Sequence, residues 1–363
     1  MCLPRWNCTF PCKAAAGIDM SPMHATMDDI ARECGLSKKT VSRVFADSSS
    51  VKKSTRDKVL ETAKRLRYEV NFLARNFSSN RSGFIGIAAP LDAMIGGNYF
   101  AQVMKGFRCA IPDDLGYVFA LFDTNSDSFS DGEKLARLYR QRRVDGLLAV
   151  AMHTADRFVD SLEQIGVPIV VVGEKSANGN ICTTYCNDAH GIELLCSHLY
   201  SCGHRRIAFI DGPPEYASSS VRKQAFMKFA RKHGLETPPQ YAQGAYTVHS
   251  GRLAATILLQ SDPRPTAIIT ANDMLAFGVI EGVRALNLRI PEDVSVAGFD
   301  DEPMAGECSP TLTTVHQPVF EIAELSARKL VQALRKGSLP SGNEIINPHL
   351  VIRESTGKPP SAK

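Results

Sequence analysis

The stretch Ser37–Asp47 reads SKKTVSRVFAD and predicts a short amphipathic helix. At helical spacing, Val41, Val44 and Phe45 fall on one face, which is typical of a buried stripe. A helix with an apolar back and a front of long donors suits the major groove of B-DNA, which admits a helix and presents acceptors such as guanine O6 and N7. The donors on the front face are Lys38, Lys39, Ser42 and Arg43.

The residues before this stretch predict another helix, joined to it by a tight turn. Thr26 is a good N-cap residue, and Asp29 stands three positions later, close to the capping-box pattern. Gly35 can adopt the left-handed conformation that ends a helix, and Ser37 can cap the next one. Two helices joined in this way form a helix-turn-helix, although an ordinary pair of solvated helices is the alternative. The apolar stripe of the first helix is Met27, Ile30, Ala31 and Cys34.

A third helix is expected to begin at Ser54 as its cap, with Asp57 three positions later. Three short helices are close to the smallest unit that folds on a hydrophobic core alone. The segment 24–80 holds 12 Lys and Arg against 7 Asp and Glu, whereas the whole chain carries a net charge of +4. Positive charge is therefore concentrated in the segment expected to meet phosphates. The expected buried stripe of the third helix is Val59, Leu60, Ala63 and Leu66.

From Gly83 onward, short apolar runs rich in β-branched residues alternate with helical stretches. Such alternation predicts parallel sheets covered by helices on both faces. The length exceeds one comfortable sheet core, so we expect two similar lobes that divide near 185–188. The expected strands are Phe84–Ala89, Tyr117–Phe122, Gly146–Ala151, Pro168–Val172, Arg206–Ile210, Ala267–Thr270 and Val294–Phe299. The expected helices are Phe100–Ala110, Asp131–Gln141, Arg157–Ile165, Gly191–Ser201, Val221–Lys232, Gly251–Leu259, Asp273–Leu286 and Val319–Lys336.

Composition is ordinary for a globular protein, with 44% hydrophobic and 22% charged residues. No apolar run reaches the roughly 20 residues that a membrane span needs, and residues 1–25 lack the apolar core of a secretory signal. We interpret that segment as a disordered tail or a start codon placed too early. The ten cysteines form no CxxC pair and have no histidines at zinc-finger spacing. We therefore expect a cytoplasmic, nucleoid-associated protein with reduced thiols and no metal or cofactor.

Polar residues follow several expected strands, at the edge of a parallel sheet where ligands bind. Asn272, Asp300 and Arg222 provide an amide, a carboxylate and a guanidinium, which can bind a polyhydroxylated molecule or a small anion. In the other lobe, Tyr99 and Phe100 follow the first strand and can stack on an apolar sugar or base face. Alternatives stay open at three of these positions. Asn272 can cap the next helix, either aromatic residue can belong to the core, and Asp300 can form an acid–base pair with its neighbour Asp301.

These residues resemble the lactose-repressor (LacI/GalR) family of bacterial transcription regulators over about 26–355. The resemblance implies a helix-turn-helix domain at 26–70, a hinge helix and linker at 71–82, a two-lobed core at 83–356 and a tail at 357–363. The core is similar to periplasmic sugar-binding proteins, with two doubly wound parallel-sheet lobes. One lobe is expected to hold about 83–186 and 317–345, and the other about 187–315 and 346–356. The motifs that carry the resemblance are DDIARECGLSKKTVSRVFAD (28–47), NFLARNF (71–77), GHRRIAFIDGP (203–213), PTAIITANDMLAFG (265–278), IPEDVSVAGFDD (290–301) and LTTVHQP (312–318).

The resemblance further implies a homodimer that binds pseudo-palindromic operator DNA. Lys38 and Lys39 stand where the family reads bases, and Arg43 stands where it makes a largely shared contact. Thr40 and Ser42 resemble phosphate-contacting or packing positions. The C-terminal sequence has no leucine heptads, so a dimer is expected instead of a tetramer. The DNA-binding residues that the resemblance implies are Ser37, Lys38, Lys39, Thr40, Ser42, Arg43, Asn71, Ala74 and Phe77.

Four positions depart from the family pattern. Phe77 takes the place of the leucine that the family wedges into the minor groove, and phenylalanine is a known wedge residue. Val70 stands where a proline often begins the hinge helix. Gly173 replaces a frequent aspartate, and Cys186 stands where aspartate is common. The last two changes bear on the ligand of the core.

The function implied is that of a repressor whose operator affinity is controlled by a small effector, most often a carbohydrate in this family. An extracytoplasmic sugar-binding protein is an alternative, but the expected headpiece argues against it. A sugar-acting enzyme using Asp300 and Asp301 is another alternative. Nothing in the sequence supplies an activated nucleophile, a phosphate-binding loop or a metal set, so we expect no enzyme. The effector-binding residues that the resemblance implies are Tyr99, Phe100, Arg222, Tyr246, Asn272 and Asp300.

Overall fold

The computed structural model describes two compact units, Met1–Arg81 and Ser82–Lys363. Within them, the described residues are 25–45, 50–68, 81–91, 97–111, 116–124, 132–150, 158–175, 181–235 and 241–360. The expected tail before residue 25 and the expected hinge positions Val70, Asn71, Ala74 and Phe77 lie outside these ranges.

The first unit contains the three expected helices, α1 (Met27–Cys34), α2 (Lys38–Phe45) and α3 (Lys53–Arg65). Helix α1 begins with the expected capping box, because Thr26 and Asp29 each accept a hydrogen bond from the other's backbone N–H. It ends at Gly35, whose φ of 65° is left-handed. The helix-turn-helix prediction is confirmed. The small core shared by the three helices is Ile30, Ala31, Cys34, Val41, Val44, Val59 and Ala63.

The start and the buried face of α3 differ from the prediction. The helix begins at Lys53 after Lys52, which makes no side-chain capping bond, so the prediction that Ser54 is the cap is wrong. Leu60 is 47% exposed, because it lies about 100° away from the stripe that faces α1. Thr62 is buried in its place and accepts a hydrogen bond from the Cys34 thiol. The contact between α3 and α1 therefore buries the polar residue Thr62 and leaves Leu60 exposed.

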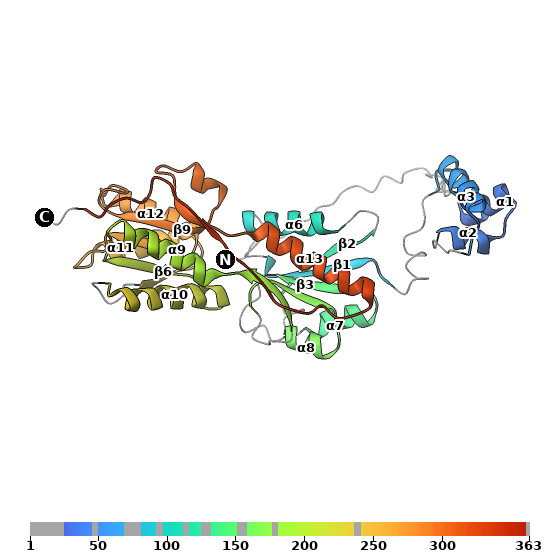
Figure 1. Ribbon diagram of the computed structural model, residues 1–363, viewed down its shortest axis with the longest axis horizontal. Helices are drawn as coiled ribbons and strands as arrows, with labels where there is room; N and C mark the ends of the chain where they lie inside the picture. The colour runs from blue at the N-terminus through green and yellow to red at the C-terminus, as the bar shows by residue number, and fades with distance from the viewer. Residues whose placement is uncertain are drawn as a thin grey trace, which may run out of the picture. The chain divides into compact units, whose positions relative to one another are not determined.

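The second unit holds two six-stranded sheets, which confirms the predicted two-lobed α/β core (Figure 1). Among the described residues, the paired strands are parallel except for β10 and β12. One sheet, in the order β11-β5-β4-β3-β1-β2, contains β1 (Phe84–Ala89), β2 (Val118–Asp123), β3 (Gly146–Val150), β4 (Ile169–Gly173), β5 (Cys182–Cys186) and β11 (Glu344–Ile346). The other, in the order β12-β10-β9-β8-β6-β7, contains β6 (Ile207–Asp211), β7 (Tyr241–Gln243), β8 (Ala267–Thr270), β9 (Ser295–Asp300), β10 (Thr313–His316) and β12 (His349–Val351).

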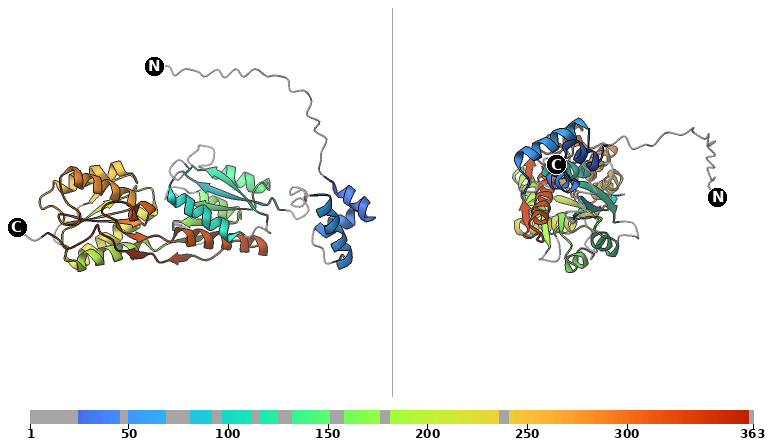
Figure 2. Two further views of the ribbon diagram at one scale, coloured as in Figure 1. Left: turned by 90° about the horizontal axis from the view of Figure 1, so that it is seen from above. Right: turned by 90° about the vertical axis from the view of Figure 1, so that its right-hand side faces the viewer.

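Helices cover both faces of each sheet, as the two lobes in Figure 2 show. Helix α13 packs along α6 on the first lobe, and Gly106 permits the approach, because a Cβ there would lie 2.5 Å from the Phe320 carbonyl oxygen. Across the described residues, no helix is long and apolar enough to cross a membrane. The helices are α6 (Asn98–Ala110), α7 (Glu133–Arg140), α8 (Phe158–Gln164), α9 (Asp188–Ser201), α10 (Ala217–His233), α11 (Val248–Leu259), α12 (Asp273–Ala285), α13 (Val319–Lys336) and the short 3-10 helix η2 (Pro303–Gly306).

The chain passes between the two sheets three times, after β5, after β10 and between β11 and β12. The first passage follows β5, which ends at Cys186. The sequence did not predict β5, β7, β10, β11 or β12. Strands β5 and β10 read CTTYC and TTVH. In β5, Thr183 Oγ1 donates a hydrogen bond to Asn343 Oδ1 over 3.1 Å. In β10, Thr313 Oγ1 donates to the Arg353 carbonyl oxygen over 3.1 Å, and Thr314 Oγ1 donates to Asp273 over 2.6 Å.

Close packing of α11 on α12 gives a stability prediction. A Cβ on Gly278 would lie 2.0 Å from the Val248 carbonyl oxygen, so Gly278→Ala must push the two helices apart. We expect a loss of about 1–3 kcal/mol in the free energy of unfolding of the core, measured by urea denaturation. The matched control is Gly306→Ala, since Gly306 has no heavy atom within 4 Å of its Cβ position. Equal effects of the two substitutions would contradict the packing argument.

Candidate functional site

The front face of α2 is arranged as the sequence indicated. Val41 and Val44 are buried at 0% and 4% exposure, while Lys39 and Arg43 are exposed on the opposite side. The cap expected at Ser37 is present, because its Oγ accepts a hydrogen bond from the Thr40 backbone N–H over 3.2 Å. The face therefore presents donors to solvent from a helix fixed by its apolar back. The other exposed members of the expected DNA-binding set on this helix are Lys38 and Ser42, with Thr40 half-buried.

Lys38 is held by an acidic neighbour from α1. Its Nζ lies 2.7 Å from an Asp28 carboxylate oxygen, and both side chains are more than half exposed. An exposed ion pair of this kind contributes little to stability, about 0–1 kcal/mol. Breaking the pair therefore costs little free energy, so Lys38 can leave Asp28 and bind an acceptor on a ligand.

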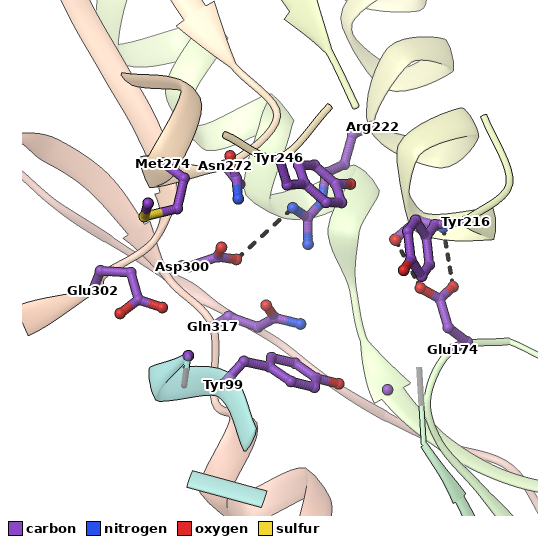
Figure 3. A pocket seen from close by; sticks show the side chains of 13 residues that line it. Tyr99, Glu174, Tyr216, Arg222, Tyr246, Asn272, Met274, Asp300, Glu302 and Gln317 are labelled. Carbon is purple, nitrogen blue, oxygen red and sulfur yellow. Dashed lines mark hydrogen bonds and ion pairs between the residues drawn. The ribbon is translucent and has the colours of Figure 1, made fainter. Parts of the chain in front are cut away.

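A pocket of about 220 Å³ lies between the two lobes of the core (Figure 3). This is small for a ligand site, since drug-sized ligands commonly occupy roughly 300–1,000 Å³. The structure brings five of the six expected effector residues to its walls. They are Tyr99, Arg222, Tyr246, Asn272 and Asp300.

The sixth expected residue, Phe100, is not among the residues that line the pocket. It packs against the main hydrophobic core from helix α6. The sequence left this alternative open, because Tyr99 and Phe100 are neighbours on one helix and point in different directions. Tyr99 is the one that reaches the cleft.

Arg222 is the central cation of the pocket. Nε and Nη2 both lie 2.7 Å from Asp188 Oδ1, and Nη1 donates to the Ala271 carbonyl oxygen over 2.5 Å. The guanidinium also stacks on Phe299, with its carbon 3.7 Å from the ring centroid. Desolvation lowers the pKa of Arg222, but Asp188 and other neighbours outweigh it and hold the pKa above its usual value. Arg222 is thus a fixed, permanently charged group at only 4% exposure.

The helix that carries Arg222 begins earlier than predicted. Helix α10 starts at Ala217 inside the loop GPPEYASSS, so Arg222 lies in its second turn and not, as expected, in its first. The helix begins without a side-chain cap of its own. One of its first N–H groups is instead satisfied from the other lobe, because Glu174 accepts from the Ser218 backbone N–H over 3.0 Å. The same carboxylate accepts from Ser218 Oγ over 2.8 Å.

At the floor of the pocket, Asn272 follows strand β8 and Asp300 ends the neighbouring strand β9. Asn272 is both a helix cap and a lining residue, since its Oδ1 accepts from the Leu275 N–H while the residue faces the cleft. Asp300 has a φ of 122°, which is rare for a residue with a side chain and is found at functional sites. Its Oδ1 lies 3.9 Å from Arg222 Nη1, beyond hydrogen-bond distance. The Asp300 carboxylate therefore faces the pocket with spare accepting capacity.

The acid–base alternative for Asp300 and Asp301 is not supported by the geometry. Asp301 is held by Arg353 Nη2 at 2.7 Å and by His316 Nδ1 at 3.0 Å. These partners lie outside the pocket around Arg222, so the two carboxylates serve different contacts. Within the described ranges, no group of three or more His, Cys, Asp or Glu side chains could hold a metal ion.

Two glycines make room for tyrosines of the pocket. A Cβ on Gly212 would lie 2.4 Å from the ring of Tyr246, whose hydroxyl is 2.8 Å from Ser219 Oγ. A Cβ on Gly173 would lie 2.2 Å from the Tyr99 hydroxyl oxygen. The phenol of Tyr99 thus fills the space next to Gly173, where the family pattern favours an aspartate side chain.

The sequence did not predict several residues of the pocket. Glu174 follows β4 and is 8% exposed, and burial raises its pKa to about 7 although the Ser218 hydrogen bonds lower it. Glu302 follows β9 and accepts a hydrogen bond from the Asn98 side chain of the other lobe. Position after a strand was the available signal for both glutamates. The remaining unpredicted lining residues include Tyr216, Met274 and Gln317.

Comparisons with known proteins agree with this arrangement. Residues 26–71 match the model for bacterial regulatory proteins of the lacI family, and residues 196–356 match a periplasmic binding protein-like domain. The presence of these two domains in one chain defines a class of regulators that join a helix-turn-helix to a ligand-binding core. Catabolite control protein A of Priestia megaterium is 30% identical over 92% of this chain and 100% of its own length. The chain belongs to the lacI family of transcriptional repressors, whose members act as regulators and not as enzymes.

Solved structures show the same fold. A lac repressor dimer bound to operator and the anti-inducer ONPF is 26% identical, with a TM-score of 0.78 over 92% of this chain and 99% of that one. A complex of the transcriptional regulator CelR with cellobiose is 27% identical, with a TM-score of 0.68 over 92% of this chain and 100% of that one. Both similarities extend over the helix-turn-helix unit and the two-lobed core.

The buried pair at the pocket floor gives a second stability prediction. Asp188→Asn removes the charge that compensates a guanidinium with 5% side-chain exposure. We expect a loss of about 3–5 kcal/mol in the free energy of unfolding, measured by denaturant titration. The control is Glu324→Gln, which breaks an exposed i,i+4 pair with Arg328 and is expected to cost less than about 1 kcal/mol. If Asp188→Asn leaves the free energy of unfolding unchanged, the burial of Arg222 does not depend on this carboxylate.

Proposed function

We propose that this chain is a homodimeric repressor whose affinity for operator DNA is set by a small effector, a sugar or sugar derivative, bound between the lobes of the core. One observation carries the proposal: a polar, aromatic-lined pocket between two lobes, in a chain whose other unit is a helix-turn-helix. A regulator of this kind acts on the chromosome, so we place it in the cytoplasm at the nucleoid.

The proposed DNA contacts begin with the front of α2. Lys38, Lys39 and Arg43 would meet base edges and phosphates in the major groove, and positive charge would release counterions from the duplex. Two copies would place α2 in successive major grooves, about one helical turn apart. The remaining proposed contacts are Ser37, Thr40 and Ser42 on this helix and, outside the described residues, Asn71, Ala74 and the minor-groove wedge Phe77.

The proposed effector contacts are the converging groups of the pocket. Asp300 and Asn272 offer hydrogen bonds to hydroxyl groups, Arg222 offers a fixed cation, and Tyr99 and Tyr246 offer apolar faces on which a sugar ring can stack. The cellobiose of the CelR complex and the ONPF of the lac repressor complex support a carbohydrate.

Coupling between pocket and DNA would pass through the angle between the lobes. Two contacts join the lobes on either side of the pocket, one between Glu174 and Ser218 and one between Glu302 and Asn98. A ligand in the pocket would compete with these contacts or strengthen them. A coupling free energy of about 1–3 kcal/mol is enough for a 5- to 150-fold change in operator affinity.

The proposed dimer would use the exposed edge of the first lobe. Strand β2 ends its sheet, and Val118 and Leu121 on it are 47% and 40% exposed. Apolar residues on an open edge strand invite pairing with another chain. The lac repressor structure is a dimer, which supports a second copy as the partner.

The DNA proposal predicts a specific loss for Lys39→Ala. An operator selected from random duplexes with the full chain would be bound about 5- to 150-fold more weakly, since a base contact contributes about 1–3 kcal/mol. Fluorescence anisotropy with the selected operator and with random duplex measures this change. Lys228→Ala, an exposed lysine of the core, is the control. If the two variants bind the operator equally well, α2 does not read it through Lys39.

The dimer proposal predicts that Leu121→Asp yields a monomer in light scattering. A two-fold interface places both copies of the same patch together, so one substitution introduces two charges. Ile345→Asp is the control, because Ile345 is 55% exposed on β11 at the opposite edge of the same sheet. A dimeric Leu121→Asp variant would exclude the β2 edge as the interface.

A further inference from the structure

The described lining of the pocket is rich in carboxylates and poor in cations. Glu174, Asp300 and Glu302 face it, whereas Arg222 is the one Lys or Arg among the described lining residues. A neighbouring cavity of about 280 Å³ shares Asp300 and Glu302 and adds Asp301, with His316 as its one basic group among described residues. The excess of acidic groups therefore continues beyond the first chamber.

The charge of Arg222 is already committed within the protein. Asp188 lies 2.7 Å from two of its nitrogens, and the Ala271 carbonyl takes a hydrogen bond from the third. An anionic ligand would have to share a neutralised guanidinium while facing three further carboxyl groups. Burial raises the pKa of all three carboxyl groups. An acidic ligand would raise these pKa values further, whereas a cation would lower them and be attracted by the ionised forms, so this lining disfavours an acidic ligand.

Two side chains that face the pocket lack hydrogen-bond partners there. Gln317 is 7% exposed, and its carboxamide makes no hydrogen bond to any described residue. It projects between Asp300 and Tyr99 in Figure 3. The Asp300 carboxylate has only the 3.9 Å ion pair with Arg222. Because the carboxamide and the carboxylate open into the pocket, they can bind a ligand that supplies both acceptors and donors.

We propose that the effector is an amine-bearing carbohydrate, with its ammonium group attracted by the carboxylates of Glu174, Asp300 and Glu302, which line different walls of the pocket. Hydroxyl groups of the ring satisfy Gln317, and the tyrosine faces of the pocket accept both the ring and the cation. This inference rests on the proposed function of the pocket and adds the charge class of its ligand.

Binding of a cation has a proton signature at Glu174. The groups that act on its carboxylate are Ser218 of α10, with Asp188 and Arg222 behind it, and Tyr99 and Tyr246 across the pocket. Burial raises the pKa of Glu174 to about 7, so part of this group is protonated near neutral pH, and burial likewise raises the pKa of Asp300 well above its usual value. An ammonium group beside it lowers that pKa and releases the proton, whereas a neutral sugar does not.

The test compares matched sugars on the purified full chain by titration calorimetry. The probes are two trios, glucose, glucosamine and glucuronate, and galactose, galactosamine and galacturonate. Titrations run at about pH 6.5, below the pKa of roughly 8 typical of an α-amino group. Within a trio, the amine is expected to bind at least about tenfold more tightly than the neutral sugar, and the acid most weakly. The amine heat is also expected to vary with the ionisation enthalpy of the buffer.

Variants tie the preference to the pocket. Glu174→Gln and Glu302→Gln are each expected to reduce the preference for the amine, while the affinity for the neutral sugar changes less than about threefold. Glu281→Gln removes an exposed carboxylate on α12 and is the control. Both glutamates also bridge the lobes, so the neutral sugar of each trio shows whether a substitution disturbs lobe closure instead of cation binding.

Three results overturn the inference: tightest binding of the acid, equal binding of the amine and the neutral sugar, or no binding by either trio. Operator binding is measured in parallel, so that failure of this inference can be distinguished from failure of the proposed function. An acidic sugar that binds and changes operator affinity refutes the charge class alone. A chain without preference for any duplex refutes the repressor itself, whatever the sugars do.

Discussion

The buried contact between Arg222 and Asp188 organises the core. Its atoms come from α10 and from the start of α9, and the same guanidinium reaches the end of β8 through Ala271 and stacks on Phe299 of β9. One cation thus ties four elements of the second lobe together at the edge where ligands of parallel sheets bind. A charge removed from water costs several kcal/mol unless it is fully paired, and this demand fixes the geometry of the pocket floor.

The wall that the first lobe contributes to the pocket contacts the same helix, α10, that carries Arg222. Helix α10 carries Arg222 inward and leaves its first N–H groups without a cap from its own side chains. Glu174 of the other lobe supplies the acceptor, and carboxylates are favoured at a helix N-terminus by the dipole as well as by the hydrogen bonds. The closure of the two lobes is therefore linked to a helix end, which is a local feature that a bound molecule can perturb.

Sequence patterns predicted the parts of the fold whose physics is local. The strand Ala267–Thr270 and the helix Val319–Lys336 have the predicted bounds, because apolar runs and helical periodicity mark them. Strands β5 and β10 escaped prediction because buried threonines in them are stabilised by partners distant in the chain. Arg222 was predicted from its place after a strand and from the family resemblance, whereas Glu174 and Gln317 form part of the pocket only where the two lobes meet. Asp188 was not predicted because its partner Arg222 lies 34 positions away in the chain.

The pairing of Gly173 with Tyr99 constrains how this pocket can evolve. Any side chain at position 173 would collide with the phenol oxygen, and the glycine has a φ of 87° that other residues rarely adopt. A larger residue at 173 therefore requires the Tyr99 ring to turn aside or to be shortened, so replacements at the two positions are coupled and each changes the space offered to a ligand.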